Sequence, residues 1–159
     1  MLDANHILTR LSWIDQDFDV MPWHDCTIYA YWSDNINVDL LMDMDYICAW
    51  VQPDGAHHPL SFYVAPATLA FHGVTDIRFS LESVANPFKL NDVRREDCRP
   101  IPNSPFETWQ WTMEGHHGML TMRAVGYTLY FRQQPTLMQV QSLSYEERGG
   151  ISFARGAQP

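Results

Sequence analysis

Three aspartates that share one side of a predicted strand are the residues of this chain best placed for chemistry. Asp39, Asp43 and Asp45 occupy odd positions of an alternating segment, and the last two would lie about 7 Å apart on an extended strand. Carboxylates at that spacing could hold a hard cation or act as an acid and base pair. A metal site also needs a loop that wraps the ion, and a continuous strand provides none. We therefore expect a solvated acidic face without a metal or cofactor.

His24-Asp25 is the second candidate. The hairpin register given below places His24 beside Asp45, where the negative charge would favour the imidazolium form. A histidine and an aspartate can orient a base, but catalysis also needs a third partner and a pocket. Cys26 follows two residues after His24, which gives a thiol beside an imidazole without an oxyanion site. We assign no catalytic residue, and we expect His24, Asp25, Asp43 and Asp45 at the mouth of any pocket.

The remaining histidines and the cysteines do not indicate a metal site. His57-His58 and His116-His117 fall in predicted loops, and neither pair has a cysteine or carboxylate at ligand spacing. Adjacent histidines on a strand point to opposite faces. The three cysteines are odd in number and widely spaced, so reduced thiols are expected.

The element that carries the aspartates is a long predicted strand from Ile36 to Trp50. Every even position in it is apolar or aromatic, which requires a sheet with one buried face. Cys26 to Ser33 precedes it, and the turn dipeptide Asp34-Asn35 between the two segments predicts a hairpin. The resulting register pairs Tyr31 with Val38, Tyr29 with Leu40, Thr27 with Met42 and His24 with Asp45.

Two further hairpins are predicted. Leu60 to Phe71 and Val74 to Leu81 join through Gly73, and Pro66 makes the first of these strands an edge or a bulged strand because it cannot donate a hydrogen bond. The last hairpin has Gly115 to Gly118 as its loop and pairs residues of matched polarity. The pairs are Trp109 with Ala124, Gln110 with Arg123, Trp111 with Met122, Thr112 with Thr121 and Met113 with Leu120.

The other segments are expected to be short or irregular. Asn5 to Trp13 could form a short helix, Asn86 to Pro105 a surface loop with one helical turn, and Glu146 to Gly150 a charged turn. Residues 154–159 are expected to form a flexible tail. The pattern predicts a mainly β domain spanning 1–159, either an antiparallel β-sandwich or a strongly curved, partly closed sheet built from hairpins.

Nineteen acidic against ten basic residues give a formal charge of −9. Such a charge repels phosphate backbones and anionic membranes, so we expect no nucleic acid or membrane partner. No segment is long and apolar enough to span a bilayer, and the first residues lack a basic stretch followed by an apolar one. A soluble, cytoplasmic protein is expected.

Three segments occur together in a recognisable order: Trp23-His24-Asp25-Cys26, then Asp43 to Ile47 with Trp50, then Val64 to Leu69 followed by Val74-Thr75-Asp76. Together they resemble a group of small, uncharacterised bacterial proteins that carry a WHD segment, a DIDY-like segment and an APATL-like segment. The resemblance covers roughly residues 18–81 and is weaker over 127–135 and 146–153. It implies a bacterial, cytoplasmic origin and no particular activity.

The leading functional hypothesis is a non-enzymatic domain that binds a basic protein through Asp39, Asp43 and Asp45. Small size and acidic charge are features shared with toxin-immunity proteins. The alternative is a small-molecule binder or hydrolase that uses the interior of the sheet, with His24, Asp43 and Asp45 at its mouth. A purely structural subunit is the third possibility. A flat acidic face around Asp39 and Asp43 would favour the first hypothesis, and a deep apolar pocket containing His24 the second.

Overall fold

Alternating apolar residues place most of the chain in strands of one antiparallel sheet. The computed structural model describes residues 10–55, 59–84 and 87–157. Its elements are β1 (Ser12–Ile14), the 3-10 helix η1 (Asp15–Val20), β2 (Thr27–Asp34), β3 (Asp39–Val51), β4 (Ser61–His72), β5 (Thr75–Leu81), β6 (Phe88–Pro100), β7 (Glu107–Gly115), β8 (Gly118–Ala124), β9 (Gly126–Phe131), β10 (Thr136–Met138) and the one-turn helix α2 (Tyr145–Arg148). The mainly β class with few short helices is confirmed.

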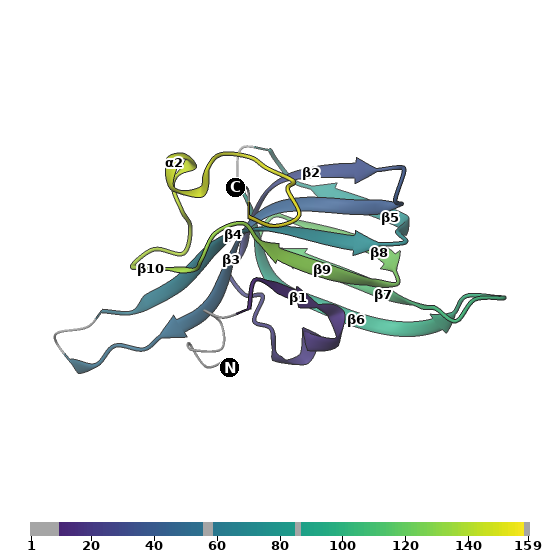
Figure 1. Ribbon diagram of the computed structural model, residues 1–159, viewed down its shortest axis with the longest axis horizontal. Helices are drawn as coiled ribbons and strands as arrows, with labels where there is room; N and C mark the ends of the chain where they lie inside the picture. The colour runs from purple at the N-terminus through teal and green to yellow at the C-terminus, as the bar shows by residue number, and fades with distance from the viewer. Residues whose placement is uncertain (1–9, 56–58, 85–86, 158–159) are drawn as a thin grey trace.

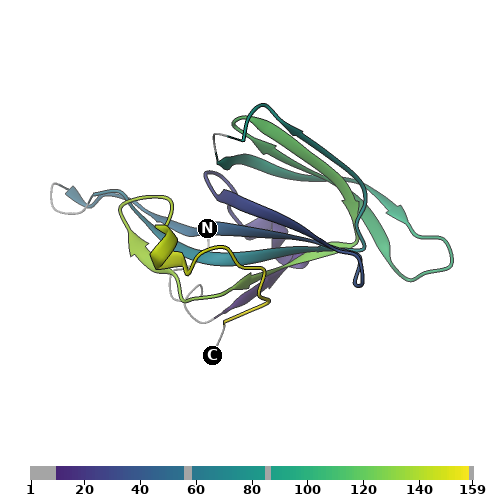
Figure 2. The ribbon, with the colours of Figure 1, turned by 90° about the horizontal axis from the view of Figure 1, so that it is seen from above.

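The sheet has ten strands and is not closed into a barrel. Its order is β1-β9-β4-β3-β2-β6-β7-β8-β5, with β10 paired to β4. The sheet bends sharply, so that β1, β9, β4, β3 and β2 form a first layer and β6, β7, β8 and β5 a second (Figure 1 and Figure 2). Among the described residues, two strand pairs join the two layers, Thr27 with Lys89 and Ile28 with Phe88, and Leu90 adds backbone hydrogen bonds with Asp25 and Cys26.

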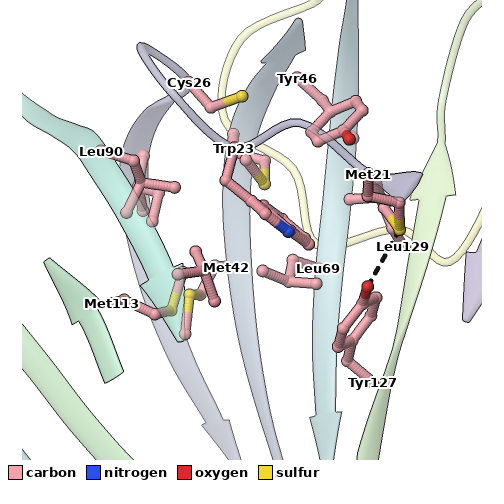
Figure 3. Packing of buried hydrophobic residues seen from close by; sticks show 14 of the residues in the cluster. Met21, Trp23, Cys26, Met42, Tyr46, Leu69, Leu90, Met113, Tyr127 and Leu129 are labelled. Atoms are coloured by element: carbon pink, nitrogen blue, oxygen red, sulfur yellow. Dashed lines mark hydrogen bonds between the residues drawn. The ribbon is translucent and has the colours of Figure 1, made fainter. Parts of the chain in front are cut away.

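The core fills the space inside the bend. Met42 and Tyr46 of β3 point into it as the alternation predicts, and Met113 of β7 comes from the other layer (Figure 3). Tyr127 also lies there and donates a hydrogen bond from its hydroxyl to the sulfur of Met21, with 2.9 Å between the two atoms. No helix among the described residues is long and apolar enough to cross a membrane.

The hairpin of β7 and β8 has the predicted register. Its two strands pair Trp109 with Ala124, Gln110 with Arg123, Trp111 with Met122, Thr112 with Thr121 and Met113 with Leu120. Trp111 is fully buried. The matched polarity of these pairs therefore identified both the partner strand and the buried face.

The hairpin of β2 and β3 exists, but its predicted register is wrong. Four residues, 35–38, form the loop, so Tyr31 pairs with Met42 instead of Val38. The cause is Asp34, whose carboxylate accepts hydrogen bonds from the backbone N–H groups of Ile36 and Asn37 and from the Asn37 side chain. From Ala30 to Asp34 the shift is four residues, which is even, so the two faces of the sheet are kept there. A bulge between Ile28 and Ala30 makes the shift three for Thr27, so Thr27 lies opposite Asp45 and Tyr29 turns to the outer face, where its hydroxyl meets Asp45.

The predicted hairpin of β4 with β5 is wrong. β4 lies between β3 and β9, whereas β5 pairs with β8 in the other layer. The strand that carries Pro66 is therefore internal. Ala67 is opposite the last residue of β9 and Val64 opposite the first residue of β10, so the ladder on this side is interrupted at Pro66. The Pro66 carbonyl points to that side, where it accepts a hydrogen bond from the Arg132 N–H. The N–H and C=O of one residue in an antiparallel strand point the same way, so the N–H that Pro66 lacks would also have pointed into the interruption.

Other segments also differ from expectation. Residues 88–100, expected as a loop, form the long strand β6. Ser12–Ile14 is a strand, while the rest of the helix expected from Asn5 falls largely outside the described residues. Glu146 to Gly150 contains the end of α2, which Gly149 terminates in the left-handed conformation at φ 74°. Arg155, placed in the expected tail, forms ion pairs with Asp34 and Asp39.

Candidate functional site

The expectation of a solvated acidic face on β3 is wrong for two of its three aspartates. Asp43 and Asp45 are both 0% exposed, because the chain from 143 to 154 crosses the outer face of the sheet above them. They therefore present no charge to a partner. Asp39, at the start of β3, is also mostly covered, with a side chain 9% exposed.

Two arginines neutralise the buried carboxylates. Arg148 of α2 contacts both oxygens of Asp43, at 2.7 and 2.9 Å, and reaches Asp45 at 3.2 Å. Arg132 pairs with Asp43 from the other side. The Tyr29 hydroxyl donates to Asp45, and burial together with the charge of Asp45 raises the pKa of that hydroxyl, so it remains protonated. The two carboxylates and the two guanidinium groups neutralise each other. This network can therefore anchor the C-terminal segment to the sheet.

Asp39 belongs to a different group of side chains. Its carboxylate lies 3.1 Å from Nδ1 of His72, and Nε2 of His72 lies 2.9 Å from the Thr128 hydroxyl. Arg155 pairs with the second carboxylate oxygen at 3.0 Å. The series Asp39, His72, Thr128 has the order of an acid, a base and a nucleophile. A hydrolase also needs an oxyanion site and a substrate cavity, and none of the cavities described below is lined by His72 or Thr128.

The predicted neighbourhood of His24 and Asp45 is also wrong, because Thr27 is the residue opposite Asp45. His24 lies before the start of β2, where its Nδ1 is 3.0 Å from the Asn91 carbonyl and its ring stacks on Trp50. The structure thus divides the four expected pocket residues. His24 and Asp25 remain together, and Asp43 and Asp45 face the two arginines.

An amide and several basic side chains from different elements surround the carboxylate of Asp25. Gln141 donates to its carboxylate at 2.7 Å, Lys89 and His116 lie 3.8 Å away, and His24 lies 3.5 Å away. Even so, no three His, Cys, Asp or Glu residues in the described part of the chain are arranged to hold a metal ion. His57-His58 lies outside the described residues.

Cys26 is not placed to act as a nucleophile. Burial raises the pKa of its thiol to about 12, so it is protonated at neutral pH. Its sulfur accepts a hydrogen bond from the Ile47 N–H inside the core. Cys26 therefore belongs to the packed core.

An apolar cleft of about 370 Å³ lies where η1 leads into β2. Its walls include Val20, Met21, Cys48 and Trp50, and Asp19 stands at its rim. Trp50 is the ring on which His24 stacks, so this cleft is the one nearest to the pocket expected from the sequence. Asp43 and Asp45 do not line it.

A second cavity, of about 360 Å³, is polar and spans the outer face of the second layer. It is lined by Asp76, Arg78, Asp97, Arg99, Gln110, Thr121 and Arg123, and we refer to it as the arginine cavity. The register of β5, β8 and β7 brings the strands together there, since Arg78 pairs with Thr121 and Arg123 with Gln110. Bulges interrupt β5 before Arg78 and β6 before Arg99.

Two aspartates of the arginine cavity have strained backbones. Asp76 and Asp97 adopt φ of 54° and 53°, which is unfavourable for residues other than glycine. Such conformations persist where the surrounding structure enforces them, and they concentrate at functional sites. Asp76 lies in the bulge of β5 and Asp97 in the bulge of β6. The first bulge turns Arg78 toward the cavity, and the second turns Arg99 toward it.

The three arginines differ in how many hydrogen-bond donors they keep. Arg123, with a side chain 11% exposed, donates to Asp97 and Thr108. Arg99 pairs with Asp97 at 2.6 Å, and its hydrogen bond helps hold the pKa of Asp97 below its ordinary value. Arg78 has no hydrogen-bond or ion-pair partner within the described ranges. Three guanidinium groups against two carboxylates leave this cavity with a positive charge in an acidic protein.

Only part of the arginine cavity was predictable from the sequence. Gln110 pairs with Arg123 as predicted, whereas β5 was expected to pair with β4 and β6 was expected to be a loop. In the predicted strand from Val74 to Leu81, Arg78 alternates with apolar Ile77 and Phe79, which is typical of a strand with one polar face but does not identify β8 as its partner.

No protein-family model matches this chain, and a search of curated proteins finds no match. The resemblance to small bacterial proteins stays a prediction.

Proposed function

We propose that this protein is a non-enzymatic binding domain that recognises an acidic group in the arginine cavity. The observation that carries the proposal is Arg78, which lines the cavity with Arg99 and Arg123 and whose guanidinium has no partner among the described residues. The class of function is the one expected from the sequence, but the recognised charge is the opposite one. A basic partner was expected at an acidic face, and burial of Asp43 and Asp45 removes most of that face.

The geometry supports recognition of an oxyanion. A guanidinium presents a planar fork of donors that matches the two oxygens of a carboxylate or phosphate. Asp97 and Thr108 hold Arg123 in place, so little side-chain entropy is lost when a ligand binds. Gln110 and Thr121 add neutral polar groups to the wall. The overall charge of −9 opposes the approach of anions, so affinity must come from contacts inside the cavity.

Titration with glutarate, a dicarboxylate, and separately with inorganic phosphate tests this proposal. Nitrogen resonances of the Arg78 and Arg99 side chains should shift with at least one of the two anions, followed by NMR at low salt. Arg78→Gln should weaken binding by roughly tenfold or more, because a hydrogen bond to a charged group contributes about 1.5–3 kcal/mol. A stronger response to one anion would identify carboxylate or phosphate as the preferred group.

Arg94→Gln is the matched control. Arg94 belongs to the same layer and carries the same charge, but it is paired with Glu114 at 2.8 Å and does not line the cavity. Binding should be nearly unchanged in this variant. Equal losses in both variants would show a general charge effect, and the absence of any shift with either anion would contradict the proposal.

A second candidate function rests on the apolar cleft beside Trp50. Its volume of about 370 Å³ is in the range of small-molecule sites, and His24 stacks on one of its walls. The alternative of a small-molecule binder is proposed at this cleft with His24 alone at its mouth. An apolar fluorescent dye should bind the protein and lose affinity in Trp50→Ala. Equal binding to both proteins would contradict this candidate.

A further inference from the structure

We propose that the acidic group is carried by an extended peptide that adds as a new strand to the open edge of β5. This inference rests on the proposed function of the arginine cavity. β5 is the last strand in the sheet order, and β8 is its one strand partner among the described residues. All seven of its residues are exposed.

The open edge of β5 faces β2 of the first layer, which it meets through a ring contact. β2 pairs with β6 only at Thr27 and Ile28, so its remaining residues have β3 as their one described neighbour. The Tyr31 ring of β2 meets the Phe79 ring of β5 edge to face, with 4.6 Å between their centroids. At one end, the Val74 N–H donates to the Val38 carbonyl. In Figure 1 both strands lie along the same side of the molecule.

Two cavities flank this ring contact. One, of about 290 Å³, is lined by Tyr31, Leu81 and Phe88 among others. The other, of about 120 Å³, is lined by Val38, Val74 and Ile77 and by four polar residues, Ser33, Asp34, Asn35 and Asp39. The hydroxyl of Tyr31 is buried and has no hydrogen-bond partner in the part of the chain that the structure describes. The edge of β5 therefore has open, largely apolar space on its inner side at both ends.

The two faces of β5 differ in chemistry. Arg78 and Ser80 face outward, opposite Thr121 and Met119, and Arg78 lines the arginine cavity. Phe79 faces inward, opposite Leu120. Strand addition supplies main-chain hydrogen bonds for affinity, while alternate side chains enter different sites for specificity. A strand beside β5 would thus direct every second side chain toward the arginine cavity.

These positions define the sequence that fits. The residue opposite Arg78 should be acidic, because cross-strand neighbours have Cβ atoms about 4.5–5.5 Å apart and a Glu carboxylate reaches the guanidinium. The residues opposite Ile77 and Leu81 should be apolar, since they enter the two flanking cavities. The residue opposite Phe79 should be small because the Tyr31 ring lies there. The occupant is therefore an extended segment in which one acidic residue stands among apolar and small ones.

A synthetic peptide with this pattern provides the test: acetyl-Thr-Val-Ser-Ala-Glu-Val-Thr-amide. In antiparallel orientation its two valines are opposite Leu81 and Ile77, its alanine opposite Phe79 and its glutamate opposite Arg78. Binding is followed by fluorescence anisotropy of a labelled form. The Glu→Gln peptide should bind at least tenfold more weakly. Arg78→Gln in the protein should weaken the parent peptide similarly and the Gln peptide hardly at all.

Two further peptides distinguish strand addition from binding of the carboxylate alone. They carry an N-methyl group on the Ala or on the adjacent Glu amide. Only every second amide of an added strand points at β5, so one methylation should reduce affinity at least tenfold and the other less than twofold. Equal effects of the two methylations would overturn strand addition.

The outcomes separate this inference from the proposed function. If glutarate binds in an Arg78-dependent way but the peptide binds no better than glutarate, strand addition is wrong and the function of the arginine cavity stands. If neither binds, both are wrong. A dimer by sedimentation that the peptide cannot dissociate would assign the edge to a second copy of the chain and would also overturn the inference.

Discussion

Asp43 is fully buried between two guanidinium groups, and these neighbours show how the protein stabilises a charge in its interior. Arg148 and Arg132 have side chains only 2% and 5% exposed. A buried ion pair contributes little compared with apolar residues of the same shape, but removal of one partner leaves the other charge unpaired in a medium that cannot solvate it. The network therefore fixes where the C-terminal segment lies, because Arg148 is satisfied only above Asp43 and Asp45.

Asp43→Ala should lower the free energy of unfolding by roughly 3–5 kcal/mol, because both arginines lose their shared partner. Urea denaturation measures the change. Asp92→Ala is the control, since that side chain is 57% exposed and its loss should change stability by no more than about 0.5 kcal/mol. Equal midpoints for the two variants would show that the arginines find other partners.

The three thiols should differ in reactivity. Cys26 and Cys48 are buried, whereas Cys98 is exposed and its sulfur lies 3.3 Å from a Glu107 carboxylate oxygen. Desolvation and the hydrogen bond to Glu107 raise the pKa of Cys98. A disulfide reagent at pH 7.5 should label one thiol in the folded protein and all three in denaturant. Glu107→Gln should speed the labelling of Cys98, since its pKa falls and the thiolate fraction rises. Labelling of two thiols in the folded protein would contradict this burial.

At the scale of elements, local pairing was predictable and long-range pairing was not. The β7–β8 hairpin closes through a short loop, so adjacency and matched polarity were enough to find its register. β4 is buried on both faces between β3 and β9, and nothing in its sequence indicates which strands are its partners. β6 was missed because its charged residues resemble a loop, although Arg95 packs its guanidinium against Trp109 inside the bend. Arg132 and Arg148 contact Asp43 but lie far from it in the sequence. The burial of Asp43 was therefore not predictable either.

The loop between β2 and β3 gives a prediction about pH. Hydrogen bonds from the side chain and backbone of Asn37, and a smaller contribution from Arg155, lower the pKa of Asp34 to about 2. The folded pKa lies below the unfolded value of about 3.9, so this stabilisation of the loop is present above the unfolded pKa and is lost as pH falls through about 2. Carboxyl carbon NMR should show that midpoint. Asn37→Ala should raise it more than Arg155→Ala does, and the reverse order would contradict the assignment.

At the scale of the whole molecule, the core connects two layers that the hydrogen-bonded ladder hardly joins. Beyond the two pairs between β2 and β6, a few backbone hydrogen bonds, such as those of Leu90 with Asp25 and Cys26, and side-chain packing hold the bend closed. Trp111 of β7 is central to it, because its ring meets Phe71 of β4 and Tyr127 of β9 at centroid distances of 5.3 and 5.5 Å. Phe18 of η1 packs edge-on against the same ring. The layers should therefore unfold together, since neither keeps its buried face without the other.

Trp111→Ala should lower the free energy of unfolding by roughly 3–5 kcal/mol, the usual cost of removing a large buried side chain. Urea denaturation measures the loss, and Trp111→Phe should cost less because it keeps part of the ring contact. Hydrogen exchange should show amides of β4 and β9 losing protection along with those of β7 and β8, since Trp111 contacts both layers. A loss below about 1 kcal/mol, or protection that persists in the first layer after the second has opened, would mean that the layers are stabilised independently.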